Sequence, residues 1–295
     1  MSNNLNKQVA VAAKWSVLSE IVAKLIVPIT SMVLARLLTP EVFGVVTTLA
    51  MVTSFASLFT DAGFLKYMIQ HEFTDEVSCK RSANVAFWSN FTLSTFIWGI
   101  IVIYAEPLAT LVGNPGLGHV LIIASLSIPI GAFSGIQSAL YKRRLDFKTL
   151  FRVRVVSVLI PLVITVPLAY WLRSYWAIVL GGLINGVVSA ILLTVLSDWK
   201  PSFFYSFSIL KDMLSFSIWS QVESISIWLT CYVDVFIVGT MLSQYYLGLY
   251  KTSSAIVGVY WGFSQPPQHR FFLLLFLDCR TMIKSLRYCF LDFKN

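Results

Sequence analysis

The stretch LARLLTPEVFGVV, residues 34–46, separates two long apolar runs and determines where the first two helices meet. Pro40 fixes its own backbone φ angle and suits the first turn of a helix. Glu41 follows it, where the positive end of the helix dipole stabilises a carboxylate. Gly44 allows another helix to approach closely. We therefore predict a tight hairpin here, and Arg36 is the residue that a purely structural turn explains least.

The composition indicates a protein that lies within a membrane. Of the 295 residues, 57% are hydrophobic and only 12% are charged, and the mean hydropathy is +0.76. Soluble domains carry about 25% charged residues, whereas a bilayer-spanning helix needs roughly 20 mainly apolar residues in succession. The start, MSNNLNKQVAVAAKW, is polar and is followed by a run too long for a cleavable signal peptide, so this run is expected to stay as the first span.

Length and polarity divide the chain into about eight spans, which makes it an all-α polytopic membrane protein. Turn-forming residues separate the spans, such as the run Gly113-Asn114-Pro115-Gly116 between the third and the fourth. The expected spans are residues 13–38, 42–64, 82–105, 117–140, 153–172, 174–197, 213–240 and 245–263.

Basic residues are distributed unevenly between the two sides of these spans. Only Arg36 and Arg173 fall on the side opposite the N-terminus. Basic loops stay in the cytoplasm, so we predict a cytoplasmic N-terminus. The net charge of +8 then reflects loops that face anionic lipids, and no nucleic-acid partner is expected. The basic residues on the N-terminal side are Lys7, Lys14, Lys66, Lys80, Arg81, Lys142, Arg143, Arg144, Lys148, Arg152, Arg154, Lys200 and Lys211.

The hairpin at residues 34–46 has a fainter second copy, VGTMLSQYYLGLY, at residues 238–250. When Gly44 is aligned with Gly248, hydrophobic residues on both sides of the glycine fall on hydrophobic residues. Six expected spans lie within the offset of 204 residues, so the two copies have the same orientation. Parallel repeats of this kind build many transporters, in which the substrate binds between the halves.

The segment LARLLTPEVFGVVTTLAMVTSFASLFTDAGFLKYMIQ, residues 34–70, resembles the first hairpin of bacterial polysaccharide flippases. These belong to the multidrug/oligosaccharidyl-lipid/polysaccharide exporter superfamily. The resemblance continues through ANVAFW (83–88), YKRRLDFKTLFRVRVVS (141–157), SYWAIVLGG (174–182) and DVFIVGTMLSQYYLGLY (234–250). It covers nearly everything from about residue 10 to residue 263.

This resemblance implies a V-shaped transporter of two six-helix lobes around a cavity, in the bacterial cytoplasmic (inner) membrane. The implied cargo is an undecaprenyl-pyrophosphate-linked oligosaccharide, the repeat unit of an O-antigen, capsule or exopolysaccharide. The resemblance also implies alternating access coupled to a gradient of H⁺ or Na⁺ or to the membrane potential. No bound cofactor is expected, and other polysaccharide-assembly membrane proteins are the expected protein partners.

The chain departs from this pattern because it stops early. We expect a cytoplasmic N-terminus (1–12), a six-helix first lobe (13–197), a cytoplasmic interfacial linker (198–212) and the first hairpin of a second lobe (213–263). Residues 264–295 form an atypical tail with tandem prolines, and its apolar core is too short to cross a bilayer. We expect a frameshifted or truncated end, which could leave an inactive fragment; the alternative is a divergent interfacial segment.

Charged residues inside a membrane are costly and point to function. Glu20 and Lys24 in the first span have the i,i+4 spacing of an ion pair. They are either a self-neutralising structural pair, or Lys24 faces the cavity and binds the pyrophosphate. Arg36 either reaches the lipid headgroups or binds phosphate oxygens bidentately in the cavity.

Three acidic residues are further candidates. Asp61, in FTDAGF, is either the start of a turn or a helix cap, and a gating residue is the functional alternative. Glu223, in WSQVESISIW, either couples transport to an ion or is a neutral acid that hydrogen-bonds between helices. Asp234, in CYVDVFIVG, is kept as a candidate for ion coupling because of the family resemblance.

An enzyme is not expected. The sequence contains no nucleophile–base pair and no phosphate-binding loop, and its three histidines and four cysteines are too scattered for a metal site. A membrane glycosyltransferase, ligase or polymerase of the same pathway is the alternative, but the large outward loop expected of such enzymes is not visible. A multidrug exporter of the same superfamily, with a cationic cargo, is a third interpretation.

Overall fold

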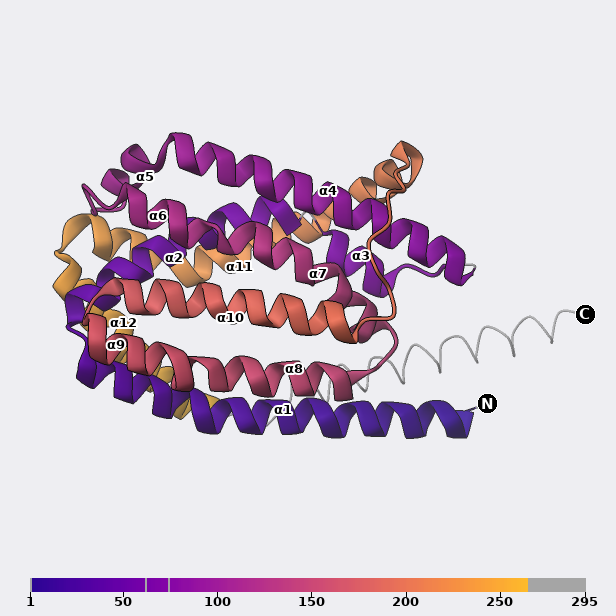
Figure 1. The fold of residues 1–295 in the computed structure, drawn as a ribbon, viewed down its shortest axis with the longest axis horizontal. Coiled ribbons are helices and arrows are strands. Elements are labelled where there is room, and N and C mark those ends of the chain that lie inside the picture. Colours follow the sequence, from indigo (N-terminus) through magenta and orange to yellow (C-terminus); the bar gives the residue numbers. More distant parts are fainter. Residues whose placement is uncertain (1, 62, 74, 265–295) are drawn as a thin grey trace, which may run out of the picture. The chain divides into compact units, whose positions relative to one another are not determined.

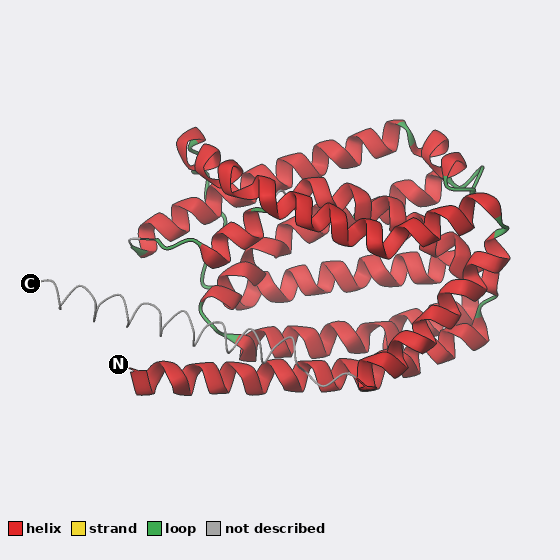
Figure 2. Ribbon diagram, turned by 180° about the vertical axis from the view of Figure 1, so that it is seen from behind, coloured by secondary structure: helices red, strands yellow, loops and turns green. Residues whose placement is uncertain are grey.

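The computed structural model describes residues 2–61, 63–73 and 75–264, which are helical with short connections (Figure 2). The elements are α1 (Ser2–Leu37), α2 (Pro40–Asp61), α3 (Phe64–Gln70), α4 (Glu76–Ile103), α5 (Ala105–Leu111), α6 (Gly118–Ser125), α7 (Ser127–Arg143), α8 (Phe147–Ile160), the π-helical turn η1 (Pro161–Thr165), α9 (Val166–Leu172), α10 (Tyr175–Leu196), α11 (Phe207–Met241) and α12 (Gln244–Ser264).

Seven helical segments of the described chain are long and apolar enough to cross a membrane, which confirms an all-α polytopic membrane protein. They are Val11–Leu37, Pro40–Thr60, Glu76–Ile103, Gly118–Arg143, Phe147–Leu172, Tyr175–Leu196 and Gln221–Met241. Two of them are interrupted, one between α6 and α7 and one by η1, where Pro161 lacks the N–H that a regular α-helix would use.

The predicted boundaries differ from the structure at two places, and one expected span differs in character. Residues 2–12 continue into the first helix, since no glycine or proline stops it there. An eighth helix, α12, forms where a span was expected, but it is not among the seven, and its first half carries Gln244, Lys251 and a run of hydroxyl side chains. The helix of the seventh span, α11, begins at Phe207, inside the predicted linker. The predicted tail, from residue 265 on, lies outside the described residues.

The turns between successive spans collect at two ends of the bundle (Figure 1). We call the end with turns at 38–39, 112–117, 173–174 and 242–243 the outer end, because the distribution of Lys and Arg predicts that it faces outward. The opposite end, with connections at 71–75, 144–146 and 197–206, is the inner end. Residues up to Ser253 form one compact unit, to which the following description applies; the rest of α12 belongs to a second.

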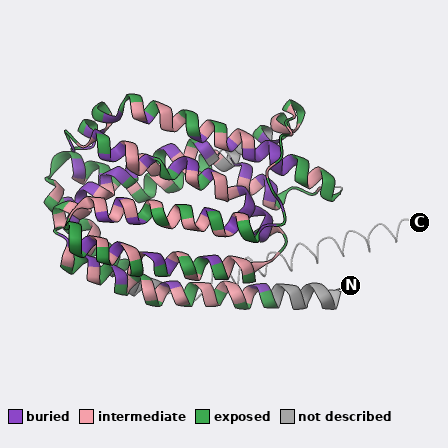
Figure 3. Ribbon diagram, viewed as in Figure 1, coloured by how far each residue is buried: buried purple, intermediate pink, exposed green. Residues whose placement is uncertain are grey.

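Small side chains lie where helices meet. Ala83 and Ala86 of α4 and Ala139 of α7 are fully buried around Phe87 in one cluster. Within a bilayer, helices associate through such close packing, because lipid is as apolar as leucine and no hydrophobic effect drives them together. Large apolar side chains remain exposed on the outside, as at Trp171, which suits contact with lipid. Figure 3 shows buried residues between the helices and exposed residues on their outward faces.

The connection between α10 and α11 is anchored on α4. Asn84 donates from Nδ2 to Ser202 Oγ (2.7 Å) and accepts at Oδ1 from the Ser202 backbone N–H (3.1 Å). Trp88 donates from Nε1 to the Ser202 carbonyl (2.9 Å) and stacks on Phe203 with ring centroids 5.0 Å apart. Asn84 is buried and therefore needs partners. The linker thus follows the surface of the first six spans at the inner end.

Candidate functional site

A polar cavity of about 280 Å³ lies between α2, α3 and α11. It therefore lies between the second span and the seventh, which is the helix predicted to begin the second lobe. Hydroxyl and amide groups are unusual inside a span, and here they come from both sides of the cavity. The lining residues are Ser54, Ser57, Leu58, Gly63, Lys66, Gln221 and Ser224.

An ion pair joins α3 to α11 at this cavity. Lys66 Nζ lies 2.8 Å from Glu223 Oε2, and the two side chains are 40% and 63% exposed. Gln221 Nε2 donates to the Leu58 carbonyl (2.5 Å), which is a polar contact between α11 and α2 at the same cavity. The turn at Gly63, whose φ of 74° favours glycine, redirects the chain after α2 so that Lys66 faces α11. An exposed pair of this kind contributes only about 0.2–1 kcal/mol, so another anion can replace Glu223.

Aromatic rings continue from this cavity along α2 and α11. Trp228 donates from Nε1 to Ser54 Oγ (3.0 Å), and Ser54 lines the cavity. The Trp228 ring lies 4.8 Å from the Phe55 ring and stacks on Tyr232 with centroids 5.4 Å apart. A cation, several hydroxyl groups and flat apolar rings are thus brought together, which is a combination suited to a ligand with both an anionic group and sugar rings.

The two copies of the repeated hairpin pack reciprocally against each other at the outer end. A Cβ atom on Gly44 would lie 2.1 Å from the Gln244 carbonyl oxygen, and one on Gly248 would lie 1.8 Å from the Pro40 carbonyl oxygen. The same offset of 204 residues relates Pro40 to Gln244 and Gly44 to Gly248, so each contact is the symmetry copy of the other. The aligned glycines are therefore the points at which the backbones of α2 and α12 touch.

Further contacts surround this crossing. Gln244 Nε2 donates to the Gly113 carbonyl (3.1 Å), and Asn114, which is buried, donates from Nδ2 to Thr48 Oγ1 (2.5 Å). Gly113 itself has φ of 80° and approaches the Gly239 carbonyl so closely that a Cβ would lie 2.8 Å from that oxygen. At the outer end, the start of α2, the 112–117 turn and the α11–α12 hairpin thus form one tightly packed layer.

The candidate residues on the first helix, two basic ligands and one acidic ion-coupling residue, do not line the cavity. Glu20, Lys24 and Arg36 all lie on α1, which packs against α8 and α9 rather than against α11. Glu20 is exposed and Lys24 is half-buried, and both take part in interactions with other residues. Arg36 is exposed in the last turn of α1 at the outer end. Their assignment as substrate-binding or ion-coupling residues stays a prediction.

The acidic candidates have three different surroundings. Helix α2 ends at Asp61, and the positive φ of Gly63 shows the predicted turn, while the Asp61 side chain lies outside the described residues. Glu223 pairs with Lys66, an arrangement that neither predicted role included. Asp234 accepts hydrogen bonds from the Tyr250 hydroxyl and from the Val235 backbone N–H, and it lies 3.9 Å from Lys251 Nζ, so its side-chain partners come from α12.

Sequence reasoning missed Lys66 and Trp228 as site residues. It placed Lys66 among the cytoplasmic loop residues because of its position between two spans. Trp228 had no distinguishing signal, since aromatic residues are frequent throughout the chain. The polar run around Gln221 was visible in the sequence, and two of its residues, Gln221 and Ser224, line the cavity.

Comparisons with known proteins show which family the chain resembles. Residues 33–266 match the model of a family described as polysaccharide biosynthesis protein. The chain is 26% identical over 247 residues to the succinoglycan biosynthesis transport protein ExoT of Rhizobium meliloti, covering 83% of this chain and 49% of the relative. It is 21% identical over 250 residues to the lipopolysaccharide biosynthesis protein WzxC of Escherichia coli, covering 84% and 50%. The chain spans about half the length of the curated relatives it matches. No solved structure gives a significant match.

Proposed function

The chain belongs to the family of polysaccharide biosynthesis proteins, and we propose that it forms part of a transporter that moves a lipid-linked oligosaccharide across a membrane. We assign it to the bacterial cytoplasmic membrane with its N-terminus in the cytoplasm, because the basic segments belong to the inner end. Relatives named as a transport protein and as a lipopolysaccharide biosynthesis protein support this function. The observation that carries the proposal is the cavity between α2, α3 and α11.

Lys66 is the residue that we assign to the phosphate part of the cargo. Its ammonium group stands at the cavity, and Glu223 is its partner while no ligand is bound. A pyrophosphate carries more charge than a carboxylate and offers several acceptor oxygens, so it replaces Glu223 at little cost. Binding of the cargo thereby releases the contact between α3 and α11.

The sugar part of the cargo then lies along the aromatic rings that continue from the cavity. Trp228, Phe55 and Tyr232 present flat apolar surfaces against which the C–H faces of sugar rings can pack. Ser54 and Ser57 supply hydroxyl groups beside these rings. Sugar hydroxyls that enter the cavity therefore have hydrogen-bonding partners at hand.

The assignment of the two lobes follows from the repeat, and the ion-coupling residues and protein partners complete the proposal. We assign residues 13–197 to a first lobe and residues 213–263 to the start of a second, related by the two reciprocal hairpins. Glu20, Glu223 and Asp234 remain the candidates for coupling to H⁺ or Na⁺. Other membrane proteins of polysaccharide assembly are the proposed protein partners.

Binding of undecaprenyl pyrophosphate to the purified full chain in detergent tests the proposed cargo. Lys66→Gln is expected to weaken binding about 10–100-fold, since a hydrogen bond to a charged group contributes about 1.5–3 kcal/mol. Glu223→Gln removes the competing carboxylate and is expected to tighten binding by up to about fivefold. Lys148→Gln, an exposed lysine elsewhere, is the control.

The opposite signs of the two effects make this test specific. A purely structural ion pair predicts that both variants lose affinity in parallel with stability. Weakening by Glu223→Gln would therefore contradict the competition between Glu223 and phosphate. Binding that is unchanged in Lys66→Gln would exclude this cavity as the phosphate site.

A further inference from the structure

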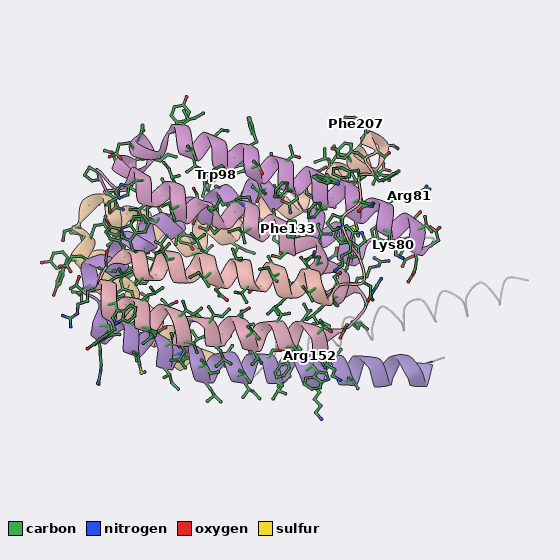
Figure 4. All side chains as sticks on the ribbon, in the orientation of Figure 1. Lys80, Arg81, Trp98, Phe133, Arg152 and Phe207 are labelled. Carbon is green, nitrogen blue, oxygen red and sulfur yellow. The ribbon has the colours of Figure 1, made fainter. Side chains whose placement is uncertain are left out.

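A second polar cavity, separate from the one described above, lies at the inner end between the start of α4, the end of α7 and the residues after α10. Its volume is about 330 Å³, several times that of a phosphate group. Lys80 on α4 and Arg143 and Arg144 at the end of α7 are among its lining residues. One span begins at Glu76 and another ends at Arg143, so the cavity lies at the depth of lipid headgroups, and Figure 4 shows Lys80 at the inner end.

Arg143 is held in a fixed position with donors to spare. Its Nη1 donates to the carbonyls of Met68 (3.1 Å) and His71 (2.5 Å), and its guanidinium lies 4.5 Å from the centre of the Phe73 ring. An arginine has five N–H donors, and these contacts use a single terminal nitrogen. The pinned guanidinium is therefore pre-organised to offer its remaining N–H groups to a planar or tetrahedral anion.

The other two cations have partners that are easily exchanged. Lys80 Nζ lies 3.9 Å from Glu76 Oε2, and Arg144 Nη1 lies 3.2 Å from Asp198 Oδ2. The Glu76 and Asp198 side chains are 81% and 88% exposed, so both carboxylates keep most of their hydration when a cation leaves them. A phosphate group, which offers several acceptor oxygens and a negative charge, can compete with these carboxylates for both cations.

Among the residues that line the cavity, cationic side chains outnumber carboxylates. Asp75 and Glu76 are the carboxylates that line it, against three cations. Asp75 accepts a hydrogen bond at Oδ1 from the Ser78 backbone N–H (3.1 Å) and thereby caps α4. One carboxylate thus has a structural role and the other is largely in solvent, while the three cations converge from two helices.

Trp199 provides an independent observation that points to a missing acceptor. Its side chain lines the cavity and the residue is only 4% exposed. Its Nε1 is buried and has no hydrogen-bond partner among the described residues. An indole N–H can only donate, and buried donors are almost always bonded. Cationic groups and an N–H without a partner beside one cavity are a combination suited to a ligand that offers acceptor oxygens.

We propose that this cavity binds a phosphate group, supplied by the headgroup of an anionic phospholipid or by free phosphate. The ligand's oxygens bond the guanidinium groups of Arg143 and Arg144, the Lys80 ammonium and the Trp199 N–H. A bound headgroup ties the end of α7 to the start of α4 and to the linker that follows α10. The site is independent of the proposed cargo cavity, and neither requires the other.

Thermal unfolding of the purified full chain in detergent tests this site. The additions are dioctanoyl phosphatidylglycerol, dioctanoyl phosphatidylcholine and inorganic phosphate, each at the same ionic strength. We expect phosphatidylglycerol to raise the unfolding midpoint by several degrees relative to phosphatidylcholine, because a ligand that binds only the folded state stabilises it. A similar rise with inorganic phosphate identifies the phosphate group itself as sufficient, and a rise with phosphatidylglycerol alone identifies the lipid as the source.

Three variants separate a built site from general charge attraction. Trp199→Phe keeps an aromatic ring and removes only the N–H, and Arg144→Gln removes one cation; each is expected to weaken the apparent affinity about tenfold. Lys142→Gln removes an adjacent exposed cation that does not line the cavity and is expected to leave the affinity unchanged. The proposal is overturned if neither phosphatidylglycerol nor phosphate shifts the midpoint, if Trp199→Phe binds as the wild type does, or if Lys142→Gln loses as much affinity as Arg144→Gln.

Discussion

Replacement of Gly44 by alanine tests whether the two hairpins are held together by direct backbone contact. The new Cβ would lie 2.1 Å from the Gln244 carbonyl oxygen, whereas ordinary contacts begin at 3.4 Å, so the two backbones must part by about 1 Å. Overpacking of a tight contact typically destabilises by about 1–3 kcal/mol. Alanine also gains up to about 1 kcal/mol over glycine through its helix propensity.

A matched control measures the contribution of helix propensity to the change in stability. Gly182 lies within α10, and a Cβ on it would meet nothing within 4 Å. Gly182→Ala is therefore expected to stabilise the protein by up to about 1 kcal/mol. The difference between Gly44→Ala and Gly182→Ala, about 1–3 kcal/mol, measures the contact alone. Thermal unfolding in detergent resolves it, because 1 kcal/mol shifts the midpoint by about 2–4 °C for domains of 150–250 residues.

The reciprocal geometry makes a sharper prediction for the double variant. Because Gly248 contacts Pro40 as Gly44 contacts Gln244, parting the hairpins for one methyl group also makes room for the other. Gly44→Ala combined with Gly248→Ala should cost about as much as the larger single change, with a coupling of about 1 kcal/mol or more. Additive effects, or a Gly44→Ala midpoint equal to that of Gly182→Ala, would refute the reciprocal contact.

Three other outcomes are expected. Lys24→Gln and Arg36→Gln should each weaken undecaprenyl pyrophosphate binding by less than threefold, well below the effect of Lys66→Gln, since α1 does not pack against α11; a larger loss would restore them as cargo ligands. Arg173→Gly should raise the stability by about 1 kcal/mol, measured by thermal unfolding, because Arg173 is exposed and has a left-handed φ of 43°. Burial raises the pKa of Tyr67, so the folded state holds its proton more tightly than the unfolded chain does. The stabilisation is complete below the ordinary pKa of about 10 and is lost as the pH rises from there through the higher pKa of the folded state. Tyr67→Phe should therefore make the unfolding midpoint less dependent on pH above about 10.

Much of the fold follows from local signals in the sequence. The hairpin before Pro40 and the turn at Gly113 are marked by residues whose backbone preferences are strong, and the structure contains both. The equivalence of Gly44 and Gly248 was also visible in the sequence, because glycine has a distinct role wherever backbones touch. What the alignment could not show is that the two glycines lie against each other's hairpins.

The direction in which a span residue faces could not be predicted. In a soluble protein, the alternation of polar and apolar residues marks the outer face of a helix, but lipid-facing and core-facing positions in a membrane are both apolar. Lys24 has a well-spaced acidic neighbour and yet lies on a helix that does not border the cavity. Lys66 lines the cavity because the chain turns at Gly63, which is a consequence of tertiary structure.

The contacts between the α11–α12 hairpin and the first six spans differ in kind between the two ends of the bundle. At the inner end, the Lys66–Glu223 pair is 40% and 63% exposed, and water or an anion can replace either partner. At the outer end, Gly44 and Gly248 bring backbones so close that neither a methyl group nor a water molecule fits between them. Separation there loses the close packing of the two backbones and exposes the buried hydrogen bond between Asn114 and Thr48 of α2. The inner end is therefore expected to open at the lower free energy, and under the proposed function a lipid-linked cargo would reach the cavity from that side, while its release outward would require the paired glycines to part.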